Sequence, residues 1–291
     1  MKRCAFLTMA NMDTFECYDH LLYKPFANVG WDVTTVPWRD TAVNWNDFGA
    51  VIIRSPWDYQ QEPALFIAVL KTIEESTAHL ENTLDIVRWN IDKTYLKDLQ
   101  TKGIQIVPTI WQDSLISRTT PSFFKDLNAT EIIIKPVISA NADHTFRLQN
   151  PIEGSTNKQL ENIFSDRPFM VQPFMKNVIT EGEFSLFYFA GAYSHTILKT
   201  PKSGDFRVQE EHGGQLTLVE PEPKLLSAGK KTMQALPEIP LYSRVDFVRT
   251  VQNHFALMEV ELIEPSLYFN MDPESAMRFS NHFDEWMHDK I

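Results

Sequence analysis

Acidic side chains gather on one face of a β-hairpin predicted near the C-terminal end of the chain. Because side chains alternate across a strand, Arg244 and Asp246 share a face of the first strand, and Glu259 and Glu261 share a face of the second. In the register we expect, Asp246 lies opposite Glu259 and Arg244 opposite Glu261, whereas a slip by one residue would move the set to the other face. The hairpin therefore predicts a cluster of three carboxylates and one guanidinium.

Two interpretations of this cluster are open. A surface ladder of ion pairs with Arg244 would neutralise part of the negative charge. However, both strands are rich in Val, Leu, Met and Phe, which indicates an interior position, where unpaired carboxylates are costly. Mg²⁺ prefers oxygen ligands and takes few carboxylates together with substrate phosphates. We therefore favour a Mg²⁺ site formed by Asp246, Glu259 and Glu261.

Cationic residues elsewhere in the chain could meet those phosphates. Lys93 lies in the first turn of a predicted helix, Lys135 closes an apolar strand, and Arg207 lies in a Gly-Asp-Phe-Arg segment between strands. Each of them alone could equally be a solvent-exposed side chain. With Gln172 and Glu183 they offer cations for phosphates, a carboxylate for ribose hydroxyls and a hinge strand for adenine. Together they indicate a site for a nucleoside triphosphate.

A candidate substrate site follows the buried strand that ends at Arg54. In parallel sheets, ligands bind beyond the carboxyl ends of the strands. Arg54 could clamp a carboxylate and Asp58 could hold an ammonium group, with Trp57 and Tyr59 as walls and Ser266 facing the same cavity. The alternative is a turn with a structural Arg–Asp pair.

Composition limits the class of partner. The chain has 291 residues, 43% of them hydrophobic, and a formal net charge of −11. This charge argues against nucleic acid or an anionic membrane as the main partner. No segment approaches the ~20 apolar residues of a membrane helix, and two cysteines without metal-type spacing favour a reducing compartment. We expect a soluble cytoplasmic protein that binds a small molecule, with a homodimer as one alternative for its quaternary state.

The elements that must position these residues fall into three predicted domains. Residues 1–90 alternate strands and helices, which predicts βαβ units and a parallel sheet. The strands are expected at 5–9, 31–36 and 50–54, and the helices at 15–28 and 66–73.

Residues 91–168 begin with a helix at 91–102 that Asn90 caps and Gly103 stops. Residues 169–291 read as antiparallel sheet with helices packed on it. The further strands are expected to end at Pro108 and to cover 131–136, 145–148, 169–174, 184–189, 193–199, 242–250 and 255–264, with helices at 158–164, 224–236 and 274–290. The predicted fold class is α/β, becoming α+β in the C-terminal part.

In its motifs the chain resembles the ATP-grasp superfamily of ligases. The similar segments, in chain order, are NIDKTYLKDLQTKGIQIVPT, EIIIKP, MVQPF, EGEFSL, GDFRVQEEHGG, RVDF and MEVELIEP. The GDFR segment is similar to the branch that contains glutathione synthetase and the ligase that modifies a ribosomal protein. VIIRSPWDY, RWNIDK and ELIEPSLY look most like a subgroup that includes the O-ureido-serine cyclo-ligase.

The resemblance implies an ATP-grasp fold with an N-terminal substrate domain, a small lid subdomain and a C-terminal domain that holds Mg²⁺. It also implies an ADP-forming, amide-forming ligase that activates a small amino-acid-like substrate as an acyl phosphate, in one variant by intramolecular cyclisation. The implied residues are Lys93 and Lys135 for the phosphates of ATP, Gln172 and Phe174 for adenine, Glu183 for ribose, Arg207 for the γ-phosphate, Arg244 for the acyl phosphate or tetrahedral intermediate, and Asp246, Glu259 and Glu261 for Mg²⁺.

The chain departs from the superfamily pattern in two places. The last metal pair is usually Glu-x-Asn, but here Glu261 occupies the Asn position, and Glu264 is an alternative third ligand. The loop at 137–145 lacks the glycines common in the phosphate lid, so that Ser139, Asn141 and His144 would replace them. Three other functions stay open: a non-catalytic nucleotide-binding protein, a phosphotransferase, and a ligase that modifies peptides or proteins.

Overall fold

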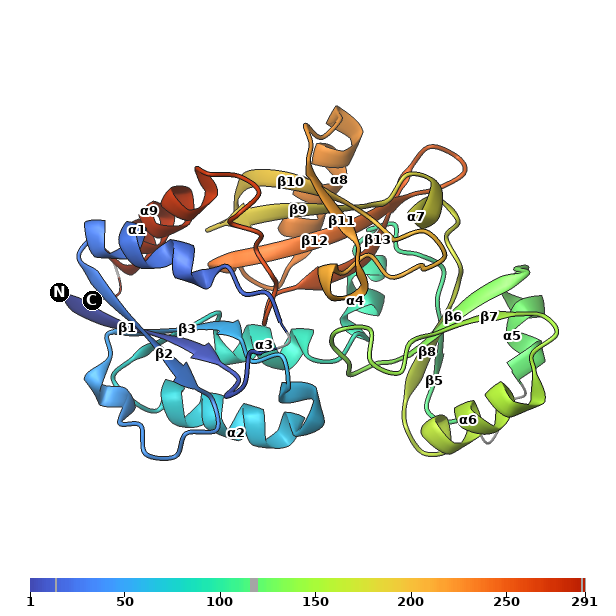
Figure 1. Cartoon of the computed structure of the whole chain (residues 1–291), viewed down its shortest axis with the longest axis horizontal. Helices are drawn as coiled ribbons and strands as arrows, with labels where there is room; N and C mark the ends of the chain where they lie inside the picture. The colour runs from blue at the N-terminus through green and yellow to red at the C-terminus, as the bar shows by residue number, and fades with distance from the viewer. Residues whose placement is uncertain (14, 116–119, 289, 291) are drawn as a thin grey trace.

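Three β-sheets organise the chain. The computed structural model describes residues 1–13, 15–115, 120–288 and 290. The first and second sheets lie towards opposite ends of the long axis, and the third spans the region between them (Figure 1). No helix in the described ranges is long and apolar enough to cross a membrane.

The first sheet is parallel, as predicted. Its strand order is β2-β1-β3-β4, with β1 at Lys2–Thr8, β2 at Trp31–Pro37, β3 at Ala50–Ser55 and β4 at His79–Glu81. The sequence did not indicate the short strand β4. The other elements here are the 3₁₀ helices η1 (Asp19–Leu22), η2 (Trp45–Asp47) and η3 (Tyr59–Gln61) and the α-helices α1 (Tyr23–Asn28), α2 (Pro63–Glu74) and α3 (Leu84–Asn90).

Two helices near this sheet are shorter than predicted. The helix expected at 15–28 begins only at Asp19 and is α-helical only in α1, because Pro25 has no N–H to continue a helical ladder from upstream. The helix expected at 91–102 is α4, Tyr95–Thr101, and Asn90 does not cap it. Instead the Asn90 side chain donates to the Val260 carbonyl at 2.8 Å, a residue 170 positions away. Because its side chain forms this long-range hydrogen bond, Asn90 does not cap α4.

The second sheet is antiparallel, with strand order β5-β8-β6-β7. Its strands are β5 (Ile110–Gln112), β6 (Glu131–Pro136), β7 (Phe146–Gln149) and β8 (Phe169–Pro173), and helices α5 (Thr120–Asp126) and α6 (Gly154–Phe164) belong with it. The strand expected to end at Pro108 is reduced to one isolated bridge, between Ile106 and Leu257. Because β8 pairs here, residues 169–173 belong to this sheet, and the domain division at 168 stays a prediction.

The third sheet, antiparallel as predicted, has the strand order β11-β10-β9-β12-β13. Its strands are β9 (Glu183–Phe189), β10 (Ala192–Thr200), β11 (Gln215–Leu218), β12 (Tyr242–Arg249) and β13 (Phe255–Glu261), and its helices are α7 (Asn177–Thr180), η4 (Glu210–His212), α8 (Pro223–Ala235) and α9 (Ser275–His288). The sequence did not indicate β11, and β13 ends three residues earlier than expected.

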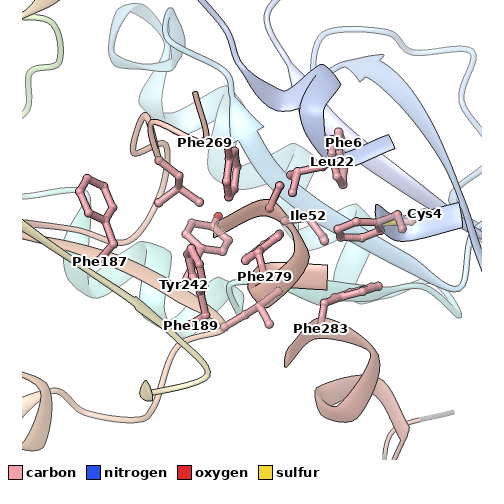
Figure 2. Packing of buried hydrophobic residues seen from close by; sticks show 14 of the residues in the cluster. Cys4, Phe6, Leu22, Ile52, Phe187, Phe189, Tyr242, Phe269, Phe279 and Phe283 are labelled. Carbon is pink, nitrogen blue, oxygen red and sulfur yellow. The ribbon is translucent and has the colours of Figure 1, made fainter. Parts of the chain in front are cut away.

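One apolar core joins the first and third sheets. Phe279 of α9 packs against Phe189 of β9 (Figure 2). Phe283 of α9 stacks on Phe26 of α1. Helices α9 and α1 accordingly lie side by side (Figure 1). The Asn82 side chain, after β4, adds polar links by donating to the Leu262 carbonyl at 2.7 Å and accepting from the Leu241 N–H at 2.7 Å. The core fixes the N-terminal sheet against the hairpin that carries the acids.

Candidate active site

The register of the acidic hairpin is the predicted one. In β12 and β13, Asp246 pairs with Glu259 and Arg244 pairs with Glu261, and a bulge follows between Asp246 and Phe247. The buried apolar residues Val245 and Val260 occupy the opposite face. Strand alternation therefore directs the charged set into one cavity and the apolar set into the core.

Most of the predicted site residues line that cavity. They are Trp57, Tyr59, Lys93, Lys135, Gln172, Phe174, Glu183, Arg207, Arg244, Asp246, Glu259, Glu261 and Ser266, together with the alternative ligand Glu264. Arg54 and Asp58 do not line it. Strands of the second and third sheets form the walls together with connecting segments, among them the one that follows β3.

Glu259 is held by the two lysines predicted to bind phosphate. Its carboxylate lies 2.9 Å from the Lys93 ammonium and 4.0 Å from that of Lys135. Burial raises the carboxyl pKa, but the two lysines outweigh it and leave the pKa of Glu259 below its ordinary value. Burial lowers the pKa of Lys135. Lys93 also donates to the Ser139 carbonyl at 2.7 Å, which links the lysine to the loop at 137–145.

Asp246 lies in a second charged group. It accepts from Ser185 at 2.6 Å and forms ion pairs with Arg244 at 3.1 Å and Lys199 at 3.4 Å. Lys199 also pairs with Glu183. Sequence reasoning missed Lys199, although the predicted hairpin of strands 184–189 and 193–199 carried the signal, since Lys199 stands directly opposite Glu183 across it.

Two carboxylates in the cavity remain poorly neutralised. Burial and the nearby carboxylates of Asp246 and Glu259, opposed by Arg244, together raise the pKa of Glu261 to about 8. Burial raises the pKa of Glu264 to about 7, opposed by a hydrogen bond from Tyr59. The interior therefore contains more carboxylate than its cations balance, and its hard oxygen donors fit a divalent cation.

The carboxylates are not arranged as a ready-made metal site. Among the residues described, no three His, Cys, Asp or Glu side chains converge on a point where a metal could bind. The reason is visible in the ion pairs, because Arg244 binds both Asp246 and Glu261 while the lysines hold Glu259. The assignment of Mg²⁺ to these acids stays a prediction.

Arg207 and the segment predicted to hold adenine, Gln172 to Phe174, also line the cavity. The Arg207 guanidinium pairs with Asp205 at 2.8 Å and its side chain is 39% exposed. Phe174, directly after β8, packs edge-on against Phe206 at 6.2 Å between ring centroids. Gln172 donates to the Thr109 hydroxyl at 3.0 Å. The aromatic ring of Phe174 and the partly exposed guanidinium of Arg207 thus line the same cavity.

Arg54 and Asp58 form ion pairs outside the cavity. Arg54 is 2% exposed and pairs with Asp19 at 2.9 Å. Asp58 accepts from Trp38 at 2.6 Å and pairs with Arg39. The structure therefore does not bring these two predicted substrate contacts to the site. Arg54 does form a structural pair with an aspartate, but with Asp19 rather than with Asp58 of its own turn.

The loop at 137–145 adopts glycine-like backbone geometry without glycine. Asn141, Ala142 and His144 have φ values of 52°, 56° and 49°, in the left-handed region. Ser139 and Asn141 line the cavity, and Asn141 donates to the Trp57 carbonyl at 3.3 Å. His144 instead lies beside Asp143 and Arg167.

The chain has the ATP-grasp fold, with a parallel N-terminal sheet and two antiparallel sheets around a cavity of alternating cations and carboxylates. It superposes on the ATP-grasp ligase PsnB, complexed with minimal precursor, Mg and ADP, with a TM-score of 0.63 and 10% identity over 96% of each chain. The enzyme is an ATP-dependent ligase.

Within this class the chain is similar to a cycloserine enzyme. The family described as the N-terminal domain of D-cycloserine synthetase DcsG matches residues 4–82. Cycloserine biosynthesis protein DcsG of Streptomyces lavendulae is 27% identical over 271 residues, which cover 89% of this chain and 90% of the relative. The crystal structure of D-cycloserine synthetase DcsG superposes with a TM-score of 0.85 and 25% identity, covering 98% of this chain and 99% of that one.

Proposed function

We propose that this ligase joins a carboxylate to a nitrogen nucleophile on a small amino-acid-like substrate, through an acyl phosphate. The observation that carries the proposal is the pairing of phosphate-type cations with carboxylates in one cavity: Lys93 and Lys135 on Glu259, and Arg244 and Lys199 on Asp246. Such an arrangement suits a reaction in which positioning and charge neutralisation do most of the catalysis.

In the first step, a carboxylate oxygen of the substrate attacks the γ-phosphorus of ATP. The bond from that phosphorus to the bridging oxygen breaks, and ADP leaves with its electron pair. In the second step, the nucleophilic nitrogen attacks the carbonyl carbon, the bond from carbon to the phosphate oxygen breaks, and the nitrogen gives up a proton. Lys93, Lys135 and Arg207 would bind the phosphates. Arg244 would stabilise the oxyanion that forms at the carbonyl.

Asp246, Glu259 and Glu261 would hold Mg²⁺, which neutralises the phosphates when it is bound. Glu261 suits this role better than Glu264, because Glu261 pairs with Arg244 across the hairpin beside Asp246. Glu264 lies beyond the end of β13, next to Tyr59 of the N-terminal domain. When the nucleotide binds, its phosphates would form ion pairs with the lysines and arginines. The carboxylates would then be free to bind Mg²⁺.

The similarity to DcsG makes cyclisation of O-ureido-serine the first reaction to test. We would measure ADP release with ATP and MgCl₂ over both enantiomers of O-ureido-serine and a panel of amino-acid pairs, with mass spectrometry of the products. The expected result is substrate-dependent ADP release with a cyclised product that is lighter than O-ureido-serine by one water, or by one water and the carbamoyl group where that group is also released. ATP binding without turnover on any compound would indicate a non-catalytic protein, and a stable phosphorylated product would indicate a phosphotransferase.

A further inference from the structure

One acid inside the cavity stands apart from the charge network. Glu183, Asp246, Glu259 and Glu261 each form an ion pair with a lysine or arginine. Within the described part of the chain, Glu264 forms no ion pair although it lines the same cavity. A carboxylate kept in a low-dielectric site without a cation has unused capacity to bind one.

The surroundings of Glu264 suit an organic cation. Two aromatic residues of the N-terminal domain, Trp57 and Tyr59, line the cavity beside it. The Tyr59 hydroxyl lies near the Glu264 carboxyl group and lowers its pKa. The Trp57 ring is backed by Phe15 at 5.4 Å and the Tyr59 ring by Phe66 at 5.0 Å between centroids. Aromatic faces and a carboxylate together are the groups that bind an ammonium ion.

The backbone around Glu264 is held by buried donors at four consecutive carbonyls. Tyr242 donates to Ile263 at 2.9 Å and Trp57 to Glu264 at 2.9 Å. Arg54 donates to Pro265 at 3.4 Å and Arg244 to Ser266 at 3.5 Å. Tyr242 itself lies in the apolar core that joins the first and third sheets (Figure 2). We call residues 263–266 the anchored segment.

The anchored segment gives Arg54 a role that its sequence position did not predict. Its guanidinium is fixed by Asp19 and turned towards the Pro265 carbonyl rather than the cavity. Trp57 both walls the cavity and holds the Glu264 carbonyl. The N-terminal domain therefore sets the position of the Glu264 side chain, and the rigidity of such a site favours selective binding.

We propose that Glu264 binds the ammonium group of the substrate, with Trp57 and Tyr59 as walls and Arg54 as a positioning residue. This inference rests on the proposed function, since it assigns the amino-acid end of that substrate. The Lys93 ammonium group lies near enough to Glu264 to lower the pKa of its carboxyl group. A molecule anchored by its ammonium at Glu264 would thus place its carboxylate at the phosphate end of the cavity.

The test compares two probes that differ only at the ammonium group: O-ureido-serine and its deamino analogue, 3-(carbamoylaminooxy)propanoate. KM from ADP release, and Kd from calorimetry with a non-hydrolysable ATP analogue and MgCl₂, are measured for the wild type, Glu264→Gln and Glu211→Gln. Glu211 is the matched control, because it is an exposed acid that lines the same cavity.

For the wild type we expect the ammonium-bearing probe to bind on the order of tenfold to a hundredfold more tightly than the analogue, the range of a charge-assisted hydrogen bond. In Glu264→Gln this ratio should fall to about twofold, while the KM values for ATP and Mg²⁺ stay unchanged. Glu211→Gln should keep the wild-type ratio.

Three outcomes would overturn the assignment: an unchanged ratio in Glu264→Gln, a raised Mg²⁺ requirement that marks Glu264 as a metal ligand, or a wild type indifferent to the ammonium group. If no probe supports turnover, the proposed function fails. The binding ratio from calorimetry still decides the role of Glu264 in that case.

Discussion

At the scale of single residues, a substitution of Arg207 should change activity with little effect on stability. Its side chain is 39% exposed and, within the described residues, forms its ion pair with Asp205, two positions before it. Exposed pairs of this kind contribute roughly 0–1 kcal/mol to stability. If Arg207 binds the γ-phosphate, Arg207→Ala should lower kcat by about two orders of magnitude or more while the melting temperature stays within ~2 °C.

The matched control is Arg88→Ala, which removes another partly exposed arginine, paired with Asp85 away from the cavity. This variant should keep both kcat and stability. Turnover by Arg207→Ala within about twofold of the wild type would remove Arg207 from the phosphate site.

At the scale of elements, the anchored segment depends on a buried ion pair from another part of the chain. Asp19→Ala leaves Arg54 charged and unpaired, which should lower the free energy of unfolding by about 3–5 kcal/mol in urea titrations. The exposed ion pair of Arg88 and Asp85 offers the control, since Asp85→Ala should lower the free energy of unfolding by about 1 kcal/mol at most.

Kinetics test whether the same pair also positions the substrate contact. The double variant Asp19→Leu, Arg54→Met removes both charges, so most of the stability should return, but the bond to the Pro265 carbonyl is lost. We expect its KM for the amino-acid substrate to rise and its KM for ATP to stay unchanged. A raised KM for ATP alone would contradict the positioning role.

The pairing of β9 and β10 carries a pH-dependent contribution to stability. His195 stacks on Phe187 at 4.3 Å between centroids, is 4% exposed, and burial lowers its pKa to about 4. The unfolded chain, with a His pKa near 6.5, binds the proton first, so this stability is complete above pH 6.5 and lost as pH falls towards 4. The loss should reach about 3 kcal/mol.

The measurement is the free energy of unfolding of the wild type and of His195→Phe at pH 7 and pH 4.5. The wild type should lose more stability than the variant over this interval, because only the wild type has the buried imidazole. Equal losses in both proteins would show that groups other than His195 dominate this pH range.

At the scale of the whole molecule, ligand binding should be visible as stabilisation. The cavity is lined by residues of the second and third sheets and of the segment after β3, so ATP with Mg²⁺ would bind only the folded chain. Saturation at a hundred times the Kd contributes about 2.7 kcal/mol and raises the melting temperature. Asp246→Asn should keep the increment from ATP in EDTA and lose the further increment from MgCl₂.

The comparison uses increments, so a change in the intrinsic stability of Asp246→Asn does not affect it. Glu211→Gln, on the rim of the cavity, should show both increments. An intact MgCl₂ increment in Asp246→Asn would exclude Asp246 as a metal ligand. No increment with ATP in any protein would contradict nucleotide binding.

The sequence by itself determined the features that depend on local periodicity. Alternation along two strands was enough to predict that Asp246 faces Glu259 and Arg244 faces Glu261. The order of the motifs was enough to indicate the ATP-grasp class. Hairpins are local, because the turn sets the register of both strands and the apolar face decides which side is buried.

Only the tertiary structure decided which partner each charged or polar side chain takes. Arg54 pairs with Asp19, 35 residues away, and Asn90 bonds Val260, 170 residues away. Neither contact follows from a helical or strand periodicity in the sequence, because buried polar groups form hydrogen bonds with the groups that the tertiary fold places beside them. For the same reason, strand position alone pointed Arg54 towards substrate, whereas packing made it the anchor of the segment that carries Glu264.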